Sequence, residues 1–470
     1  MEQKDTLYHM VYEHLKHDIL QSKFKAGEKL PSLKDLCEYY QVGRNTMRYA
    51  IHLLEEIGFV MPAQGSNHIV IYNIDDFEYN RAYRLMIISK CQAAHEVLKI
   101  LGLIMPLIAQ EALSKSSDYD QESMLKIIEH IENDKNANPN ILLEQLMKLY
   151  TIAFANLNNT MFLNLFQTMM SFITIPINTN DSNRFTSRYI QRRIRVAAMH
   201  NFKKAIKGKT LVLKKIIPIF TSLVDKGGDH FCKEHCGDLK EYEPILFVWR
   251  AELQQRFLYN QVSVDILHMI TSTGLMFGDK LPSIEELGNK YGVSKNTIIK
   301  SIEELRLYGI VESVNGIGTI LAYDEHTNLQ GILEKPHVQC KLITFHEMLE
   351  LSKWILSSFQ KKQFKNISQE ACDVTLSRLD KDFSLQPIMH MICESYNPTL
   401  SYIFRQMSDS FVWQVFTMLL KQQDKFVIQS EETKSKIKQA LKNGDMEIVQ
   451  KLLIHTLNNY EKALQKAGFK

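Results

Sequence analysis

The chain has 470 residues, of which 45% are apolar, so it is long enough for about two to four domains with substantial cores. Its 56 Lys and Arg nearly balance its 53 Asp and Glu, and the formal net charge is only +3. This balance excludes a polyelectrolyte such as a histone-like packing protein, so a nucleic-acid surface would have to be a local patch. Seven scattered cysteines form no disulfide framework and no apolar leader follows Met1, so we expect a reduced, cytoplasmic protein.

The stretch from 151 to 180 has no charged residue and could be mistaken for a membrane span. Asn158 and Asn164 interrupt it, and Pro176 lies near its end. It contains no run of about 18 apolar residues, which a spanning helix would need. We therefore predict a pair of buried helices and no membrane partner.

The chain contains an internal repeat at a fixed offset. Gly27–Leu33, with the sequence GEKLPSL, returns as Gly278–Ile284, with the sequence GDKLPSI, at an offset of 251 residues. Between Gly27 and Tyr72, 17 of 46 positions are identical in the second copy, where about three are expected by chance. One module is therefore used twice, and we name the copies the first and the second module.

Three helices are predicted in each module. In the first module, apolar residues at three- and four-residue spacing indicate a helix from Thr6 to Ser22. Ser32 can cap the start of a second helix, and Asp35 completes a capping-box-like pair with it. A third helix is predicted from Arg44 to Ile57. Its inward stripe is formed by Met47, Ala50, Ile51 and Leu54.

A β-hairpin is predicted after the third helix. Gly58 ends that helix, and a strand begins at Phe59–Val60. Ala63–Ser66 has the composition of a tight turn, and Ile69–Ile71 is the predicted return strand. Helix, helix, turn, helix and hairpin follow one another in the order of a winged helix-turn-helix.

These segments resemble the GntR family of bacterial transcription regulators. That family opens its second helix with leucine-proline-serine, opens its recognition helix with a valine-x-basic-x-threonine pattern, and places leucine-x-x-x-glycine before the wing. The first module has these motifs at Leu30–Ser32, Val42–Thr46 and Leu54–Gly58, and the second has them at Leu281–Ser283, Val293–Thr297 and Leu305–Gly309. The second wing, Gly316–Thr319, matches the glycine-x-glycine-threonine pattern of the family, whereas the first has Gly65–His68, with the sequence GSNH.

The resemblance implies a transcription regulator, which we expect to be a repressor, with double-stranded DNA as its partner. It implies that the start of the recognition helix enters the major groove, where Arg reads guanine and Asn or Thr reaches bases or phosphates. The implied DNA-binding residues are Lys34, Arg44, Asn45, Thr46, Arg48 and Gly65 in the first module, and Lys295, Asn296, Thr297, Gly316, Gly318 and Thr319 in the second. Glu285 replaces Lys34 and Ile299 replaces Arg48 in the second module, so we expect it to bind DNA less tightly or in a different register.

The rest of the chain is predicted to be helical. Helical stripes run through Val97–Leu113, Ser123–Glu132, Ile141–Phe154, Met161–Ile173, Met348–Phe359, Pro398–Leu420 and Lys434–Leu464. The predicted fold is therefore mainly α: winged helix-turn-helix domains at 1–76 and 257–324 alternate with all-helical domains at 77–256 and 325–470. The resemblance implies that these helical domains sense a small-molecule effector.

A metal site and a cofactor are not expected. The best-known helical domain of this family holds a metal with one Asp and three His, but Lys434 and Thr456 occupy two of the positions of its closing helices. The segment from His230 to Cys236 is too short to close well around zinc, so an ordinary loop is favoured. His390 and His455 are interpreted as core or surface histidines.

Three further expectations concern function and assembly. No phosphate loop, nucleophile elbow or HExxH motif occurs, which argues against an enzyme and leaves an architectural or partner-recruiting protein as the alternative. A basic run with Arg184, Arg188, Arg192 and Arg195 on one helical face is a solvated face, a DNA-flanking face or the anion-binding side of an effector pocket. Because one chain holds two modules, we expect an internal pseudo-dimer, which can dimerise further, on an asymmetric operator.

Overall fold

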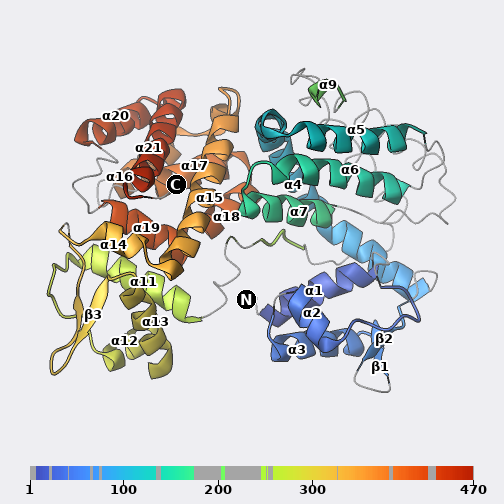
Figure 1. Cartoon of the computed structure of the whole chain (residues 1–470), viewed down its shortest axis with the longest axis horizontal. Helices are drawn as coiled ribbons and strands as arrows, with labels where there is room; N and C mark the ends of the chain where they lie inside the picture. Colours follow the sequence, from blue (N-terminus) through green and yellow to red (C-terminus); the bar gives the residue numbers. More distant parts are fainter. Residues whose placement is uncertain are drawn as a thin grey trace.

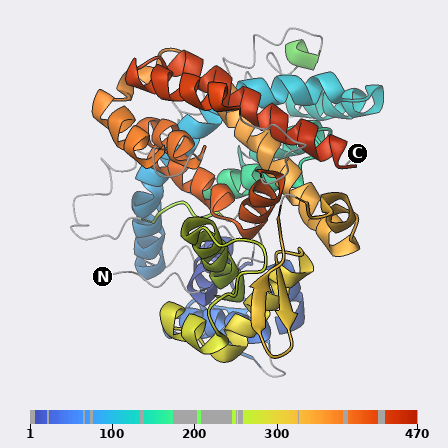
Figure 2. The same cartoon turned by 90° about the vertical axis from the view of Figure 1, so that its left-hand side faces the viewer.

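The computed structural model places two winged modules on one side of a layer of helices. It describes residues 7–20, 24–40, 42–63, 67–72, 77–133, 139–173, 203–206, 245–249, 251, 258–324, 326–379, 385–421 and 430–468. Figures 1 and 2 show both winged modules below the helical layer, so the same side of the molecule carries both.

The first module has the predicted order of elements. It consists of α1 (Leu7–Leu20), α2 (Leu33–Tyr39), α3 (Arg44–Glu56), β1 (Val60–Pro62) and β2 (His68–Val70). The strands pair antiparallel with Val60 opposite Val70, and the predicted stripe of α3 is buried. The side chain of Ser32 caps α2 by accepting from the backbone N–H of Asp35. The Asp35 carboxylate accepts from the Ser32 hydroxyl at 2.6 Å, whereas in a full capping box it would accept from the backbone N–H of Ser32.

The second module repeats this arrangement with more regular ends. It consists of α11 (Leu258–Thr273), α12 (Ile284–Tyr291), α13 (Lys295–Leu307), β3 (Val311–Val314) and β4 (Gly318–Leu321). Ser283 and Glu286 form a complete capping box at the start of α12. The antiparallel wing pairs Val311 with Leu321, so both predicted winged folds are confirmed.

The first helical region follows the first module. Its elements are α4 (Phe77–Lys115), α5 (Asp118–Asn133), α6 (Pro139–Ala155), α7 (Thr160–Ile173) and the short α9 (Lys203–Ile206). The apolar stripe of α7 is buried, as predicted; residues 174–180 lie outside the described ranges. In the described part of the chain, one stretch, Gln92–Lys115 within α4, is long and apolar enough to cross a membrane, and 61% of its most apolar window is buried.

The second helical region contains more helices than the sequence stripes predict. Its elements are α14 (Leu329–Leu333), α15 (Pro336–Ser358), the 3₁₀ turn η5 (Gln363–Asn366), α16 (Gln369–Leu379), α17 (Gln386–Tyr396), α18 (Pro398–Ser408), α19 (Phe411–Lys421), α20 (Glu431–Lys442) and α21 (Met446–Lys466). The stripe predicted over Pro398–Leu420 is interrupted at Asp409–Ser410. The Ser410 hydroxyl accepts from the backbone N–H of Trp413 at 3.1 Å and starts a new helix there.

The repeat continues beyond the winged modules at the same offset. The buried positions Val97, Leu98 and Leu101 of α4 correspond to the buried Met348, Leu349 and Ser352 of α15. The start of α7 likewise corresponds to the start of α19. The halves differ where Pro336 begins α15: α14 and α15 are separate helices, whereas α4 runs without a break through the matching position.

Both helical regions share one hydrophobic core, which extends into the second module. Buried polar contacts join the regions: Glu347 of α15 accepts from the backbone N–H of Thr160 at 2.6 Å, and Asn159 donates to the backbone carbonyl of Glu347 at 3.1 Å. Trp354 of α15 donates to the carboxylate of Glu111 at 2.7 Å. The first module has a separate core of its own.

Candidate DNA-binding surface

The start of α3 brings the predicted reading residues of the first module together. Arg44, Asn45 and Thr46 form its first turn, and Arg48 lies one turn later; Arg44, Asn45 and Arg48 are exposed, and Thr46 is half-buried. The pKa of the Cys37 thiol in α2 is raised, because burial raises it more than the charges of Arg44 and Arg48 lower it. Both guanidinium groups therefore lie near α2, at the side where the two helices meet.

The basic side chains on this surface make no ion pairs within the described ranges. Lys34 is exposed in the first turn of α2, and neither it nor Arg44 or Arg48 has an acidic partner there. An unpaired guanidinium at the start of a recognition helix can contact guanine or phosphate without first breaking an internal bond. We name this surface, formed by Lys34, Arg44, Asn45, Thr46 and Arg48, the first reading face.

The matching surface of the second module carries a weaker charge. The Lys295 ammonium lies 3.8 Å from the Glu285 carboxylate, and the two side chains are 69% and 71% exposed. Ile299 at the position of Arg48 is 40% exposed and apolar. Asn296 is exposed beside them. The second reading face, formed by Glu285, Lys295, Asn296, Thr297 and Ile299, therefore presents a partly neutralised cation and an apolar side chain.

The recognition helix of the second module is the better capped of the two. Ser294 accepts from the backbone N–H of Thr297, and the two hydroxyl groups are 2.9 Å apart. Gly43 occupies the corresponding position before α3 and supplies no side-chain cap. The hydroxyl of Thr297 therefore has an internal partner, whereas the N–H groups at the start of α3 lack a side-chain acceptor at that cap.

The two wings differ in what fixes them. In the second wing, Gly316 and Gly318 have φ of 78° and 115°, and a Cβ at Gly318 would lie 3.1 Å from the Lys280 side chain. Gly318 thus lets Lys280 lie across the wing, a basic residue that the sequence pattern did not single out. Thr319 is half-buried, and its carbonyl accepts from the N–H of Leu281 at 2.8 Å.

The first wing is tied to its recognition helix. His68 Nε2 lies 2.6 Å from the carboxylate of Glu55 in α3. Gly65, a predicted DNA-binding residue, and its neighbour Ser66 lie outside the described residues. The corresponding residues of the second module are Thr319 and Arg306, which cannot form a histidine–carboxylate contact, so the second wing lacks this connection to its recognition helix.

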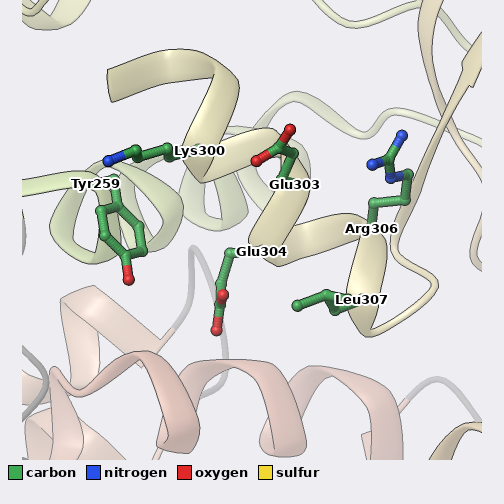
Figure 3. Close-up of a pocket in the computed structure, with 6 residues that line it drawn as sticks. All are labelled: Tyr259, Lys300, Glu303, Glu304, Arg306 and Leu307. Carbon is green, nitrogen blue, oxygen red and sulfur yellow. The ribbon is translucent and has the colours of Figure 1, made fainter. Parts of the chain in front are cut away.

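A surface hollow of about 350 Å³ lies beside α13 in the second module (Figure 3). Its lining residues are Tyr259, Lys300, Glu303, Glu304, Arg306 and Leu307. Figure 3 shows Lys300 beside Tyr259, with Glu304 pointing away from them. Burial raises the pKa of Glu304, and Lys341 and His337 of α15 lower it. The hollow thus lies close to α15, where the module meets the helical layer.

The other predicted ligand groups fall into two classes. The segment from His230 to Cys236 and the arginines of the basic run lie outside the described ranges. Lys203, which follows those arginines in the sequence, is described, and its ammonium lies 3.4 Å from the Glu132 carboxylate. Within the described ranges no group of three or more His, Cys, Asp or Glu could hold a metal ion. His455 is exposed, and Thr456 is buried with its hydroxyl donating to the carbonyl of Leu452.

Comparisons with known proteins agree with this geometry. The family model described as bacterial regulatory proteins, gntR family, matches residues 7–70 and 258–321. The chain is 37% identical over 65 residues to the uncharacterized HTH-type transcriptional regulator YhcF of Bacillus subtilis, covering 14% of this chain and about half (54%) of that protein. It is 30% identical over 105 residues to the HTH-type transcriptional repressor YtrA of the same organism, covering 21% of this chain and 81% of the relative.

A solved structure of Streptococcus agalactiae GntR aligns with 44% of this chain and 99% of its own length, at 14% identity and a TM-score of 0.16. The family assignment depends on the two matched modules and on the YtrA relative. The two segments matched by the family model contain the elements that form the reading faces. This chain therefore belongs to the gntR family of bacterial regulatory proteins, and it carries the DNA-binding helix-turn-helix module of that family twice.

Proposed function

We propose that the chain is a sequence-specific transcription repressor that acts in the cytoplasm, by binding rather than by catalysis. The observation that carries this proposal is the first reading face, where Arg44, Arg48 and Lys34 are exposed and have no acidic partner within the described ranges. The name of the YtrA relative supports repression rather than activation. The first module then supplies most base recognition, and the second module supplies a weaker contact.

The proposed division of the chain follows its repeat. Winged domains at 1–76 and 257–324 bind DNA, and helical regions at 77–256 and 325–470 respond to a small-molecule effector. The contacts of α15 with Thr160 and Glu111 support an internal pseudo-dimer whose halves meet through their helical regions. Because Arg48 and Ile299 differ, the operator has two unlike half-sites.

The test is selection of binding sites from random duplex DNA with the purified chain, followed by gel-shift competition at moderate salt. A recovered motif with two unlike half-sites, and competition by that motif but not by scrambled DNA, supports the proposal. Equal competition by every duplex contradicts it, because phosphate contacts alone carry no sequence information. A strictly symmetric motif contradicts the unequal roles of the two modules.

A further inference from the structure

A cavity of about 620 Å³ lies where the second module meets the second helical region. The first helix of the module, α11, contributes Leu267, His268 and Thr271 to its lining, and the remaining lining residues come from α16 to α19, their adjoining segments and α21. Helix α11 packs against both α13 and α19, so the cavity lies against the same helix that supports the recognition helix. Figure 1 shows α11 and α19 as neighbours at this junction.

The polar wall of the cavity is a cluster of charges around a half-buried histidine. The pKa of His390 is lowered, and burial is the largest cause. The charges of Asp409 and Glu394 raise this pKa, whereas those of Arg405 and Arg378 lower it, so all four charged side chains lie near the imidazole. His390 Nε2 is 3.3 Å from the Ser408 hydroxyl. Within the described ranges neither arginine makes an ion pair, although Asp409, the C-cap residue of α18, follows Arg405 by four residues.

Two unpaired guanidinium groups that line one cavity are suited to an anionic group, which they can bind in a planar, bidentate manner. The lining also includes apolar side chains, among them Leu267, Trp413 and Met418. A ligand that contacts both kinds of lining residue has an anionic head and an apolar body. Because Glu394 and Asp409 also line the cavity, a head with a single negative charge is favoured over one with several.

We infer that this cavity binds a small organic monoanion, a carboxylate or a phosphate diester with an apolar body, and that the bound ligand fixes the second module against the helical layer. The inference rests on the proposed regulatory function, of which it identifies the effector site. The docking that the ligand would reinforce is already extensive. Tyr308 packs edge-on against Phe411 at 5.4 Å between ring centroids, and the Tyr323 hydroxyl donates to the carbonyl of Leu419.

The first experiment measures ligand binding by titration calorimetry on the full chain without DNA. The probes are benzoate, octanoate and diphenyl phosphate, each with one negative charge, and benzyl alcohol is the uncharged control. We expect saturable binding of at least one anion, no binding of the alcohol, and at least tenfold weaker binding in Arg405→Met and Arg378→Met. Lys451→Met, at an exposed position of α21 outside the cavity lining, should bind like the unmodified chain.

A second variant separates loss of the site from loss of the fold. Thr271→Trp fills the α11 side of the cavity from an exposed helix position, so it should abolish binding of the anion while the melting temperature stays within a few degrees. No saturable binding of any anion, or undiminished binding in Arg405→Met and Thr271→Trp, overturns the site.

The link to the second module is tested on the operator recovered by selection. A saturating anion should change the Kd for that operator at least threefold in the unmodified chain and not in Arg405→Met; an unchanged Kd overturns the link. Because the calorimetry needs no DNA, its failure removes only the effector site, whereas failure of the DNA selection removes the regulatory function and leaves the binding result intact.

Discussion

At the scale of single residues, the two reading faces differ in whether their cations are already paired. Arg44 and Arg48 have no acidic partner within the described ranges, while Lys295 lies 3.8 Å from Glu285. A good bidentate base contact discriminates by about 1–3 kcal/mol, so Arg44→Ala or Arg48→Ala should weaken operator binding by roughly 5- to 150-fold. Lys295→Ala should cost less. Binding isotherms on specific and scrambled duplexes check this, and a silent Arg44→Ala beside a damaging Lys295→Ala would reverse the roles of the modules.

The charge of Glu285 makes a second prediction. Glu285→Lys removes the partner of Lys295 and adds a cation in the first turn of α12. It should tighten binding to all duplexes alike and steepen the dependence of log K on log salt by about one unit, because it adds a phosphate contact without base readout. Glu447→Lys makes the same charge change at an exposed position of α21 and should leave the slope nearly unchanged. A gain confined to one sequence would contradict the phosphate assignment.

The half-buried His390 predicts a pH dependence of stability. Burial, the largest effect, holds its pKa below the usual value of about 6.5. The neutral histidine therefore favours the folded state fully above about pH 6.5, and this contribution is lost as the pH falls through the lowered pKa of the folded protein. His390→Gln should flatten the decline in unfolding free energy between about pH 7 and 5, as urea titrations would measure. An identical decline in the variant would assign it to other groups.

At the scale of secondary-structure elements, the turn after α13 is shaped by α14. Gly309 has φ of 68°, and a Cβ there would lie 3.2 Å from Cδ1 of Ile332 in α14. Gly292 has φ of 65°, and a Cβ added to Gly292 would have no other atom within 4 Å. Both Gly→Ala changes carry a left-handed backbone cost of about 1–2 kcal/mol, and Gly309→Ala adds an overpacking cost of about 1 kcal/mol. Urea unfolding of the two variants measures this difference. Equal midpoints would show that the Ile332 side chain moves away from the added Cβ without a cost in stability.

The elements also show what the sequence could predict. The winged modules follow from local signals, since caps such as Ser32 and Ser283 and the buried stripe of α3 are read within a few residues. The break between α18 and α19 was missed because the apolar stripe continues through it, although a cap at Ser410 was a usable signal. The cavity at α11 could not be predicted, because Arg378, His390 and Arg405 come from three different helices that only packing brings together.

At the scale of the whole molecule, the separation of the cores predicts how the chain unfolds. The first module has its own core around Leu15, while the second module and both helical regions share one that includes Leu349. Calorimetry of the full chain should therefore resolve two transitions. Leu15→Ala should reduce the unfolding free energy of the first module by about 2–5 kcal/mol and shift only its transition to lower temperature. Leu349→Ala should do the same for the other transition only. One transition that shifts with both variants would mean that the first module unfolds together with the rest.

The long helix α4 follows the first module in the sequence, and Pro106 lies in its last third. Its 39 residues extend about 58 Å at 1.5 Å per residue, and the first module lies before its first turn. Among the described residues, no single helix of this length follows the second module, because α15 begins separately from α14 at Pro336. A residue inserted into or deleted from α4 shifts the two parts of the helix by about 1.5 Å and rotates them by about 100° relative to each other. We therefore predict that relatives whose half-sites are spaced differently have α4 helices that differ in length by whole helical turns.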